Sequence, residues 1–149
     1  MIVDVDQSGK LEDTSVPTAV ALANGHKRCL LISAMEKRKL QKIFREMNKP
    51  RLYAYRTFSI LIFVLLQKNM KRIDRVVIDT EYPGYDHVIS CMISETAALF
   101  GVSKLLPDVV FEQVGKASTS HLLAYDVFKK KRKPDITVTA ADVLRILTK

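Results

Sequence analysis

The sequence has only two cysteines, Cys29 and Cys91, among its 149 residues. Each lies alone in an apolar run (CLLIS and ISCMIS), with no second cysteine or histidine at the spacing of a metal site. This pattern argues against a structural zinc site and against a disulfide framework. Unpaired cysteines are typical of a reducing compartment, so we expect a cytoplasmic location.

Long apolar segments are also missing. The longest run, Phe58–Leu66, is far shorter than the ~20 apolar residues that a membrane-spanning helix needs, so we expect a buried helix there and no membrane association. The opening residues MIVDVD do not resemble a secretory leader. No internal repeat or disordered linker is visible, and 48% hydrophobic residues are enough for a core, so we expect one domain over residues 1–149.

Acidic residues are outnumbered by basic ones. The chain has 24 Lys and Arg against 16 Asp and Glu, a net charge of +8, and the basic residues gather at 27–28, 36–42 and 129–133. A polyanion is the simplest partner for such a chain, because each neutralised phosphate releases condensed counterions. Many soluble proteins are basic without binding nucleic acid, so charge alone leaves both readings open.

Alternation of apolar and acidic residues predicts a strand over Ile2–Asp6. Successive side chains of a strand point to opposite faces, so Val3 and Val5 would share one face and Asp4 and Asp6 the other. Further strands are predicted by β-branched or apolar runs at Thr18–Ala23, Arg28–Ser33, Arg75–Asp79 and Pro107–Val114. The Asn24-Gly25 pair between the second and third strands is a strong hairpin signal.

Helical spacing of apolar residues predicts the remaining elements. Ser33, either Ser118 or Ser120, and Thr139 are suited to begin helices as N-caps. The predicted helices cover about 33–47, 53–69, 87–100, 118–133 and 139–147. The sequence therefore predicts an α/β fold with helices on both faces of a five-stranded mixed sheet, made of a three-strand antiparallel meander plus two parallel strands.

In that layout the first strand and Arg75–Asp79 are neighbours, which brings Asp6 close to Asp79. Carboxylate oxygens suit Mg²⁺ or Mn²⁺, and two such ions can promote phosphodiester cleavage. A third acid is needed, and Asp126 on the helix after the fifth strand is the natural candidate. Acids at strand ends also cap turns or pair with lysine, so the pattern has an ordinary structural explanation as well.

The predicted order of elements resembles that of the ribonuclease H-like superfamily. Three short segments carry the resemblance: DQSG closes the first strand, IDTEY closes the fourth strand and SHLLAYD lies on a late helix. The resemblance implies a three-layer fold and a two-metal nuclease that uses Mg²⁺ or Mn²⁺. It implies that Asp6 and Asp79 hold metal and that Asp126 completes the site. His121 corresponds to a family histidine that assists proton transfer or product release, and Lys116 would contact phosphate.

The family pattern also has a glutamate on its first helix, which the acid-free segment Tyr53–Leu66 lacks. Resolvase-like members lack it too and match better, which would imply a homodimer. Glu46 precedes this segment and Glu81 follows Asp79, so neither has the position of that glutamate. Asp4 could replace it as a ligand or belong to an edge of the site. Tyr82 and Tyr85 could stack on bases or simply form a loop.

The basic run Lys129, Lys130, Lys131, Arg132 and Lys133 suits contacts with phosphates, or simply a solvated helix end. The sequence therefore favours a metal-dependent nuclease acting on DNA, RNA or a hybrid. The alternative is a non-catalytic ribonuclease H-like module that binds nucleic acid or a protein partner. A small-molecule phosphotransferase has less support, because the chain has no glycine-rich phosphate loop.

Overall fold

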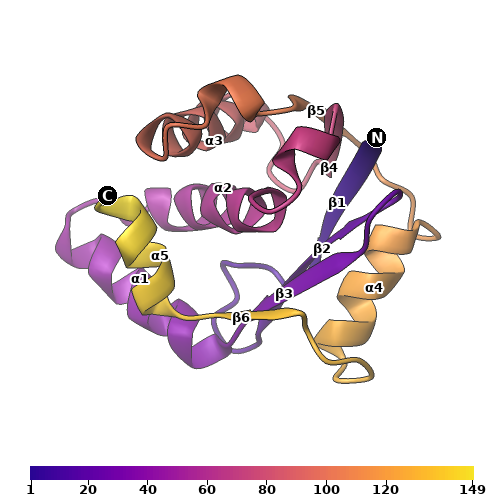
Figure 1. Ribbon diagram of the computed structural model, residues 1–149. Coiled ribbons are helices and arrows are strands. Elements are labelled where there is room, and N and C mark those ends of the chain that lie inside the picture. The colour runs from indigo at the N-terminus through magenta and orange to yellow at the C-terminus, as the bar shows by residue number, and fades with distance from the viewer.

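The computed structural model describes residues 1–149 and contains one six-stranded mixed sheet in the order β5-β4-β1-β2-β3-β6 (Figure 1). The strands are β1 (Ile2–Ser8), β2 (Thr18–Ala23), β3 (Arg28–Ile32), β4 (Arg75–Asp79), β5 (Asp108–Glu112) and β6 (Ile136–Val138). Strands β1, β2 and β3 form an antiparallel meander, and β4 and β5 continue the sheet parallel to β1. The predicted meander and the two added parallel strands are confirmed.

The predicted number of strands was wrong by one. Strand β6 pairs in parallel with β3 at the edge of the sheet. It spans only Ile136–Val138, which is too short for a periodic pattern to stand out in the sequence. A backbone contact between distant segments, in which Asp135 N–H donates to the Cys29 carbonyl at 2.8 Å, brings this segment alongside β3.

Five α-helices cover the two faces of the sheet unequally. They are α1 (Ala34–Glu46), α2 (Leu52–Leu66), α3 (Asp86–Leu99), α4 (Thr119–Phe128) and α5 (Ala140–Leu147), with short 3-10 turns at Met70–Arg72 and Ser103–Leu105. Helix α4 covers one face alone, and the other helices lie on the opposite side (Figure 1). None of the helices combines the length and apolar character required to cross a membrane.

The alternation along β1 separates a core face from a polar face. Val3 and Val5 are fully buried in the large core cluster on the α2 side, as the sequence predicts. A smaller cluster under α4 is built from Ala19, Ala21, Cys29, Leu123, Ala124 and Val127. The small side chains in β2 let α4 approach the sheet closely, so the acids of β1 lie beside this helix.

Strand β1 is longer than predicted, because Gln7 and Ser8 also pair with β2. Asp6 therefore lies within the strand rather than at its end. The parallel register pairs Val5 with Ile78, so the next residue on each strand is Asp6 or Asp79. The predicted proximity of these two acids follows directly from this register.

The predicted N-caps are present in the structure. The side chain of Ser33 accepts a hydrogen bond from Glu36 N–H, and that of Ser118 accepts one from His121 N–H. Thr139 forms a reciprocal capping box with Asp142 at the start of α5. These side chains satisfy N–H groups that have no partner within the helix, which is why helices begin at them.

Replacing Thr139 with alanine should lower the free energy of unfolding by about 1 kcal/mol, because α5 loses its capping hydrogen bond. Urea denaturation of the wild type and the variant measures this difference. Thr139→Ser keeps the hydroxyl group and should stay close to the wild type. An alanine variant as stable as the serine variant would contradict a capping role.

Candidate metal centre

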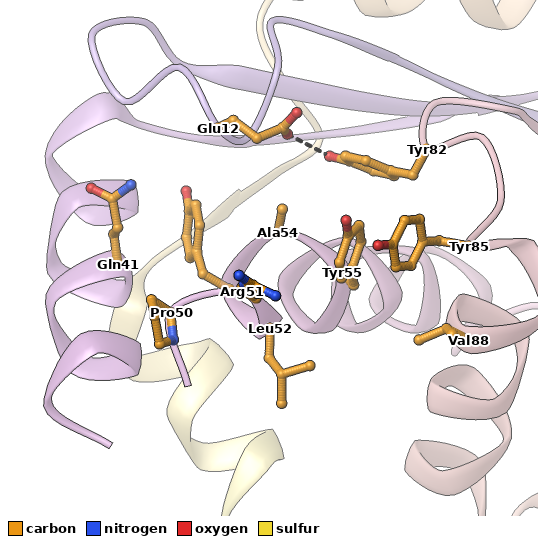
Figure 2. Close-up of a pocket in the computed structure, with 11 residues that line it drawn as sticks. Glu12, Gln41, Pro50, Arg51, Leu52, Ala54, Tyr55, Tyr82, Tyr85 and Val88 are labelled. Carbon is orange, nitrogen blue, oxygen red and sulfur yellow. Dashed lines mark hydrogen bonds between the residues drawn. The ribbon is translucent and has the colours of Figure 1, made fainter. Parts of the chain in front are cut away.

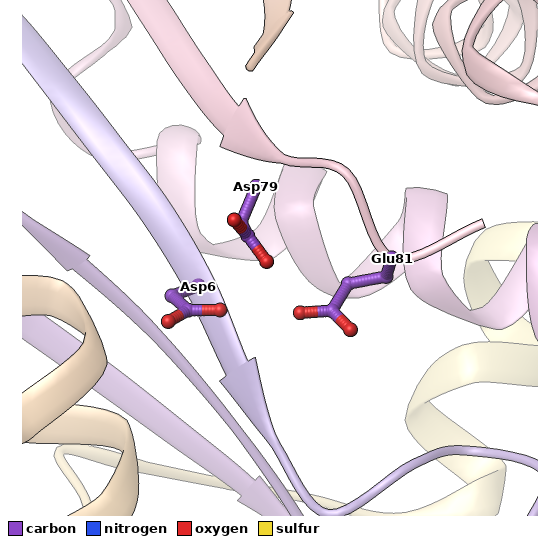
Figure 3. A group of neighbouring side chains, drawn as sticks. All are labelled: Asp6, Asp79 and Glu81. Carbon is purple, nitrogen blue, oxygen red and sulfur yellow. The ribbon is translucent and has the colours of Figure 1, made fainter. Parts of the chain in front are cut away.

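Three carboxylates converge where β1 and β4 lie side by side. Asp6 comes from β1, Asp79 ends β4, and Glu81 follows two residues later. Each offers an oxygen, and these oxygens lie within 4.8 Å of one another. Figure 3 shows Asp6 and Glu81 approaching from opposite sides of the space below Asp79. This acidic cluster contains the two acids that the sequence placed together, with Glu81 as the third.

Backbone donors orient two of these acids. Gln7 N–H donates to Asp6 Oδ1 at 2.8 Å, and Val114 N–H donates to Asp79 Oδ1 at 2.7 Å. These contacts fix the carboxylates against the sheet and against the segment after β5. No lysine or arginine forms an ion pair with any of the three acids.

His121, in the first turn of α4, contacts the cluster through Asp6. Its Nδ1 lies 2.8 Å from Asp6 Oδ2. An ionised carboxylate only accepts hydrogen bonds, so Nδ1 carries the proton in this pair and Nε2 is left free. The His121 side chain is 30% exposed, whereas that of Asp6 is 4% exposed. The histidine therefore connects a buried acid to the solvent.

Crowding of the acids changes their protonation. Burial raises the pKa of Asp6, the His121 contact opposes this change, and the charge of Asp79 adds to it. Burial, together with the neighbouring Asp79 and Asp6, raises the pKa of Glu81 to about 9. A proton on Glu81 is therefore retained at neutral pH, and a divalent cation could relieve the same repulsion in its place.

The acidic cluster lines a cleft of about 360 Å³ that also contains Lys10, Lys116 and His121. Gln7 lies in its wall, and Gln7 Oε1 is buried without a hydrogen-bond partner. Successive side chains of a strand point to opposite faces, so the Gln7 side chain lies on the face of β1 opposite to Asp6 and this oxygen is not part of the acidic cluster. The cleft thus brings three carboxylates together with Lys10, Lys116 and His121.

Comparison with protein-family models, curated proteins and solved structures found no match to this chain. The arrangement of the residues is therefore the basis for assigning a role to the cleft.

The loop after β1 holds one wall of the cleft in place. Gly9 has a φ of +80°, and a side chain there would meet the Pro17 carbonyl oxygen at 2.3 Å. Lys37, which is fully buried, donates to the carbonyl oxygens of Lys10 and Asp13 and to the Thr18 hydroxyl. Lys37 therefore stabilises this loop by hydrogen bonds, so the basic residues of α1 are not all solvated.

Asp126 was expected to complete the metal site, and this expectation was wrong. Ser120, Leu123, Ala124 and Val127 are the buried positions of α4. Asp126 lies five residues after His121, about 140° around the helix, so the two side chains leave α4 on different sides. His121 is the residue of α4 that reaches the acids, and Asp126 is not part of the cluster.

Asp4 also lies outside the cluster, contrary to its expected role as a ligand. It shares the α4 face of β1 with Asp6, but its Oδ1 accepts a hydrogen bond from Asn24 Nδ2 at 2.9 Å. It lines a separate hollow that is bounded by the segment after β5. The Asn24 contact and burial at this position account for Asp4 without a metal.

The basic residues are divided between two places. Lys116 lines the acidic cleft. Residues 129–133 are all exposed and follow the end of α4 away from His121. Their contacts with phosphate remain a prediction. Lys10, which directly follows the DQSG segment that contains the first acid, was missed in the sequence.

Proposed function

We propose that this protein is a ribonuclease H-like, metal-dependent nuclease whose catalytic site is the cleft containing Asp6, Asp79 and Glu81. The observation that carries the proposal is the convergence of three carboxylates with no lysine or arginine paired to them. Ionised carboxylates this close together repel one another, and a divalent cation bound among them would offset that repulsion.

The topology supports the fold assignment within this proposal. As predicted, β1, β2 and β3 form an antiparallel meander, and β4 and β5 extend the sheet parallel to β1. Helices cover both faces of this sheet. The resemblance implies acids on β1 and at the end of β4, which correspond to Asp6 and Asp79. In this assignment β6 is an addition to the edge of the family sheet.

The residues of the cleft fit a divalent cation of the Mg²⁺ or Mn²⁺ type. Asp6, Asp79 and Glu81 would hold it through their carboxylate oxygens. When bound, such ions lower the pKa of water and stabilise charge on the leaving oxygen of a phosphodiester. Replacement of the proton on Glu81 by a cation would accompany binding.

The remaining side chains have roles that do not depend on the cation. Lys10 and Lys116 would bind the substrate phosphate electrostatically and position it over the acids. His121, held through Nδ1 by Asp6, offers Nε2 to exchange a proton with the attacking water or the leaving oxygen. Water would then form the new bond to phosphorus as the bond to the leaving oxygen breaks.

Cleavage of labelled single-stranded, duplex, hybrid and branched substrates in Mg²⁺, Mn²⁺ or a chelator tests this proposal. We expect metal-dependent cleavage by the wild type and a loss of at least about 100-fold in Asp79→Asn, because the acid that ends β4 would no longer bind the cation. Asp126→Asn is the matched control, since it removes an acid outside the cluster, and it should cleave as the wild type does.

Failure of the wild type to cleave any substrate with any metal, while salt-sensitive binding persists, would reject the nuclease. That result would favour the non-catalytic nucleic-acid-binding module. Equal activity of Asp79→Asn and the wild type would show that the cleft is not the catalytic site.

A further inference from the structure

A second cavity, the tyrosine pocket, opens on the side of the sheet that α2 covers. Its volume is about 480 Å³, within the range of small-molecule sites. Its walls come from the loop after β1, the start of α2 and the segment between β4 and α3 (Figure 2). Four tyrosines line it: Tyr53, Tyr55, Tyr82 and Tyr85.

The rings are held in a fixed arrangement. Tyr55 and Tyr85 are stacked, with centroids 4.3 Å apart and planes 14° apart, and Tyr82 meets Tyr55 edge-on at 5.4 Å. Tyr85 is nevertheless 43% exposed. A stacked aromatic platform that is open to solvent suits a planar ring, because nucleobases stack on aromatic side chains regardless of their sequence.

Two charged side chains that line the pocket, Glu12 and Arg51, can form hydrogen bonds with a nucleotide. Tyr82 donates its hydroxyl to Glu12 Oε1 at 2.9 Å, which orients a carboxylate at the pocket wall (Figure 2). A carboxylate accepts hydrogen bonds from the amino and ring N–H groups of a base. Arg51 is exposed at the same opening and can pair with a phosphate.

The pocket and the acidic cleft share their supporting segments. Glu81 belongs to the cluster and Tyr82, the next residue, belongs to the pocket. The loop between β1 and β2 also contributes to both sites, because Lys10 lines the cleft and Glu12 lines the pocket. The side chains of Lys37 and Tyr53 hold this loop in place by donating hydrogen bonds to its carbonyl oxygens. The Cα atoms of consecutive residues are about 3.8 Å apart, so the chain at Glu81 and Tyr82 passes directly from one site to the other, and neighbouring nucleotides of one strand can occupy both.

We propose that the tyrosine pocket binds an unpaired base next to the phosphate held in the cleft, so that the substrate is single-stranded nucleic acid or an unpaired segment of a branched one. This inference rests on the proposed function. A base within a continuous duplex is stacked and paired on both sides, and it could enter the pocket only after being flipped out.

The test is binding of an oligonucleotide of about ten nucleotides that carries one 2-aminopurine, with a chelator present so that no cleavage occurs. We expect the fluorescence of 2-aminopurine to be quenched on binding and the affinity to fall about tenfold or more in Tyr85→Ala. Tyr85→Phe retains the ring and should restore binding. Tyr125→Ala removes a tyrosine of similar exposure, 40%, from α4 and should bind as the wild type does.

Several results would overturn the inference: equal affinity for the single strand and its duplex, unchanged binding in Tyr85→Ala, or an equal loss in Tyr125→Ala. Quenching by free 2-aminopurine nucleotide at the same concentration as the oligonucleotide would also overturn it, because the pocket would then be a mononucleotide site. The assay needs no metal. If 2-aminopurine is quenched but the wild type cleaves no substrate, the proposed nuclease activity is rejected and the pocket is retained. If the wild type cleaves but 2-aminopurine is not quenched, the pocket is rejected and the nuclease activity is retained.

Discussion

The Asp6→Asn variant should lose metal-dependent cleavage by about 1,000-fold or more and remain folded. The effect should exceed that of Asp79→Asn because Asp6 has two roles. It contributes an oxygen to the acidic cluster, and it orients His121 through a 2.8 Å contact. An asparagine keeps the size of the side chain and its acceptor for Gln7 N–H, so the strand should be preserved.

Asp4→Asn provides the matched control for this experiment. Asp4 is two residues earlier on the same strand and on the same face, but it is hydrogen-bonded to Asn24 and lies outside the cluster. Initial rates of cleavage at saturating Mn²⁺ should therefore differ greatly between the two variants. Equal losses of activity would indicate that the whole acidic face of β1 acts through the fold rather than through one catalytic acid.

Glu81→Gln should stabilise the metal-free protein by about 1–2 kcal/mol at pH 8 and abolish its stabilisation by Mn²⁺. Burial and two neighbouring acids raise the pKa of Glu81 to about 9, so ionising it in the folded state is unfavourable. Water reaches part of this side chain and screens the repulsion, which keeps the expected gain modest. A residue that costs stability and binds a cation is typical of a functional site.

The same carboxyl group predicts how stability depends on pH. Its pKa is higher in the folded chain than the ordinary value of 4.5, so the folded state binds more protons between pH 4.5 and about 9. The free energy of unfolding of the metal-free wild type should therefore fall as pH rises through this window. Above pH 8 the buried Lys37, whose pKa is lowered to about 8, acts in the opposite direction.

Urea denaturation of the wild type and Glu81→Gln between pH 5 and about 8, with and without Mn²⁺, measures both effects. The wild type should show the steeper loss with pH, and Mn²⁺ should stabilise it most at the upper end. Glu95→Gln, a change at an exposed acid of α3 outside the cluster, is the control. Identical pH slopes in all three proteins would contradict strong coupling among the three acids.

The local features of the fold could be predicted from the sequence because they depend on neighbouring residues. The alternation at Val3, Asp4, Val5 and Asp6 sets which side chains face the core, and the structure confirms it. The N-caps at Ser33, Ser118 and Thr139 were predictable for the same reason, since their partners lie three residues away. The proximity of Asp6 and Asp79 followed from placing two parallel strands side by side.

Only the tertiary structure decided which residues complete the candidate site. The rotation of α4 against the small side chains of β2 brings His121 to Asp6 and turns Asp126 away. The path of the chain after β4 carries Glu81 back toward the acids. These outcomes depend on how α4 and the segment after β4 pack against the sheet, which no short stretch of sequence contains.

The tyrosine pocket and the burial of Lys37 also belong to the tertiary structure. The pocket combines segments around residues 12, 53 and 82, and Lys37 is buried because the loop between β1 and β2 folds over it. The sequence by itself determined five of the six strands and the helix starts, because those depend on short-range periodicity and hydrogen bonding, and it placed Asp6 beside Asp79 through the parallel pairing of two predicted strands. Long-range packing decided the third acid, the histidine and the second cavity, because each requires contacts between segments far apart in the chain.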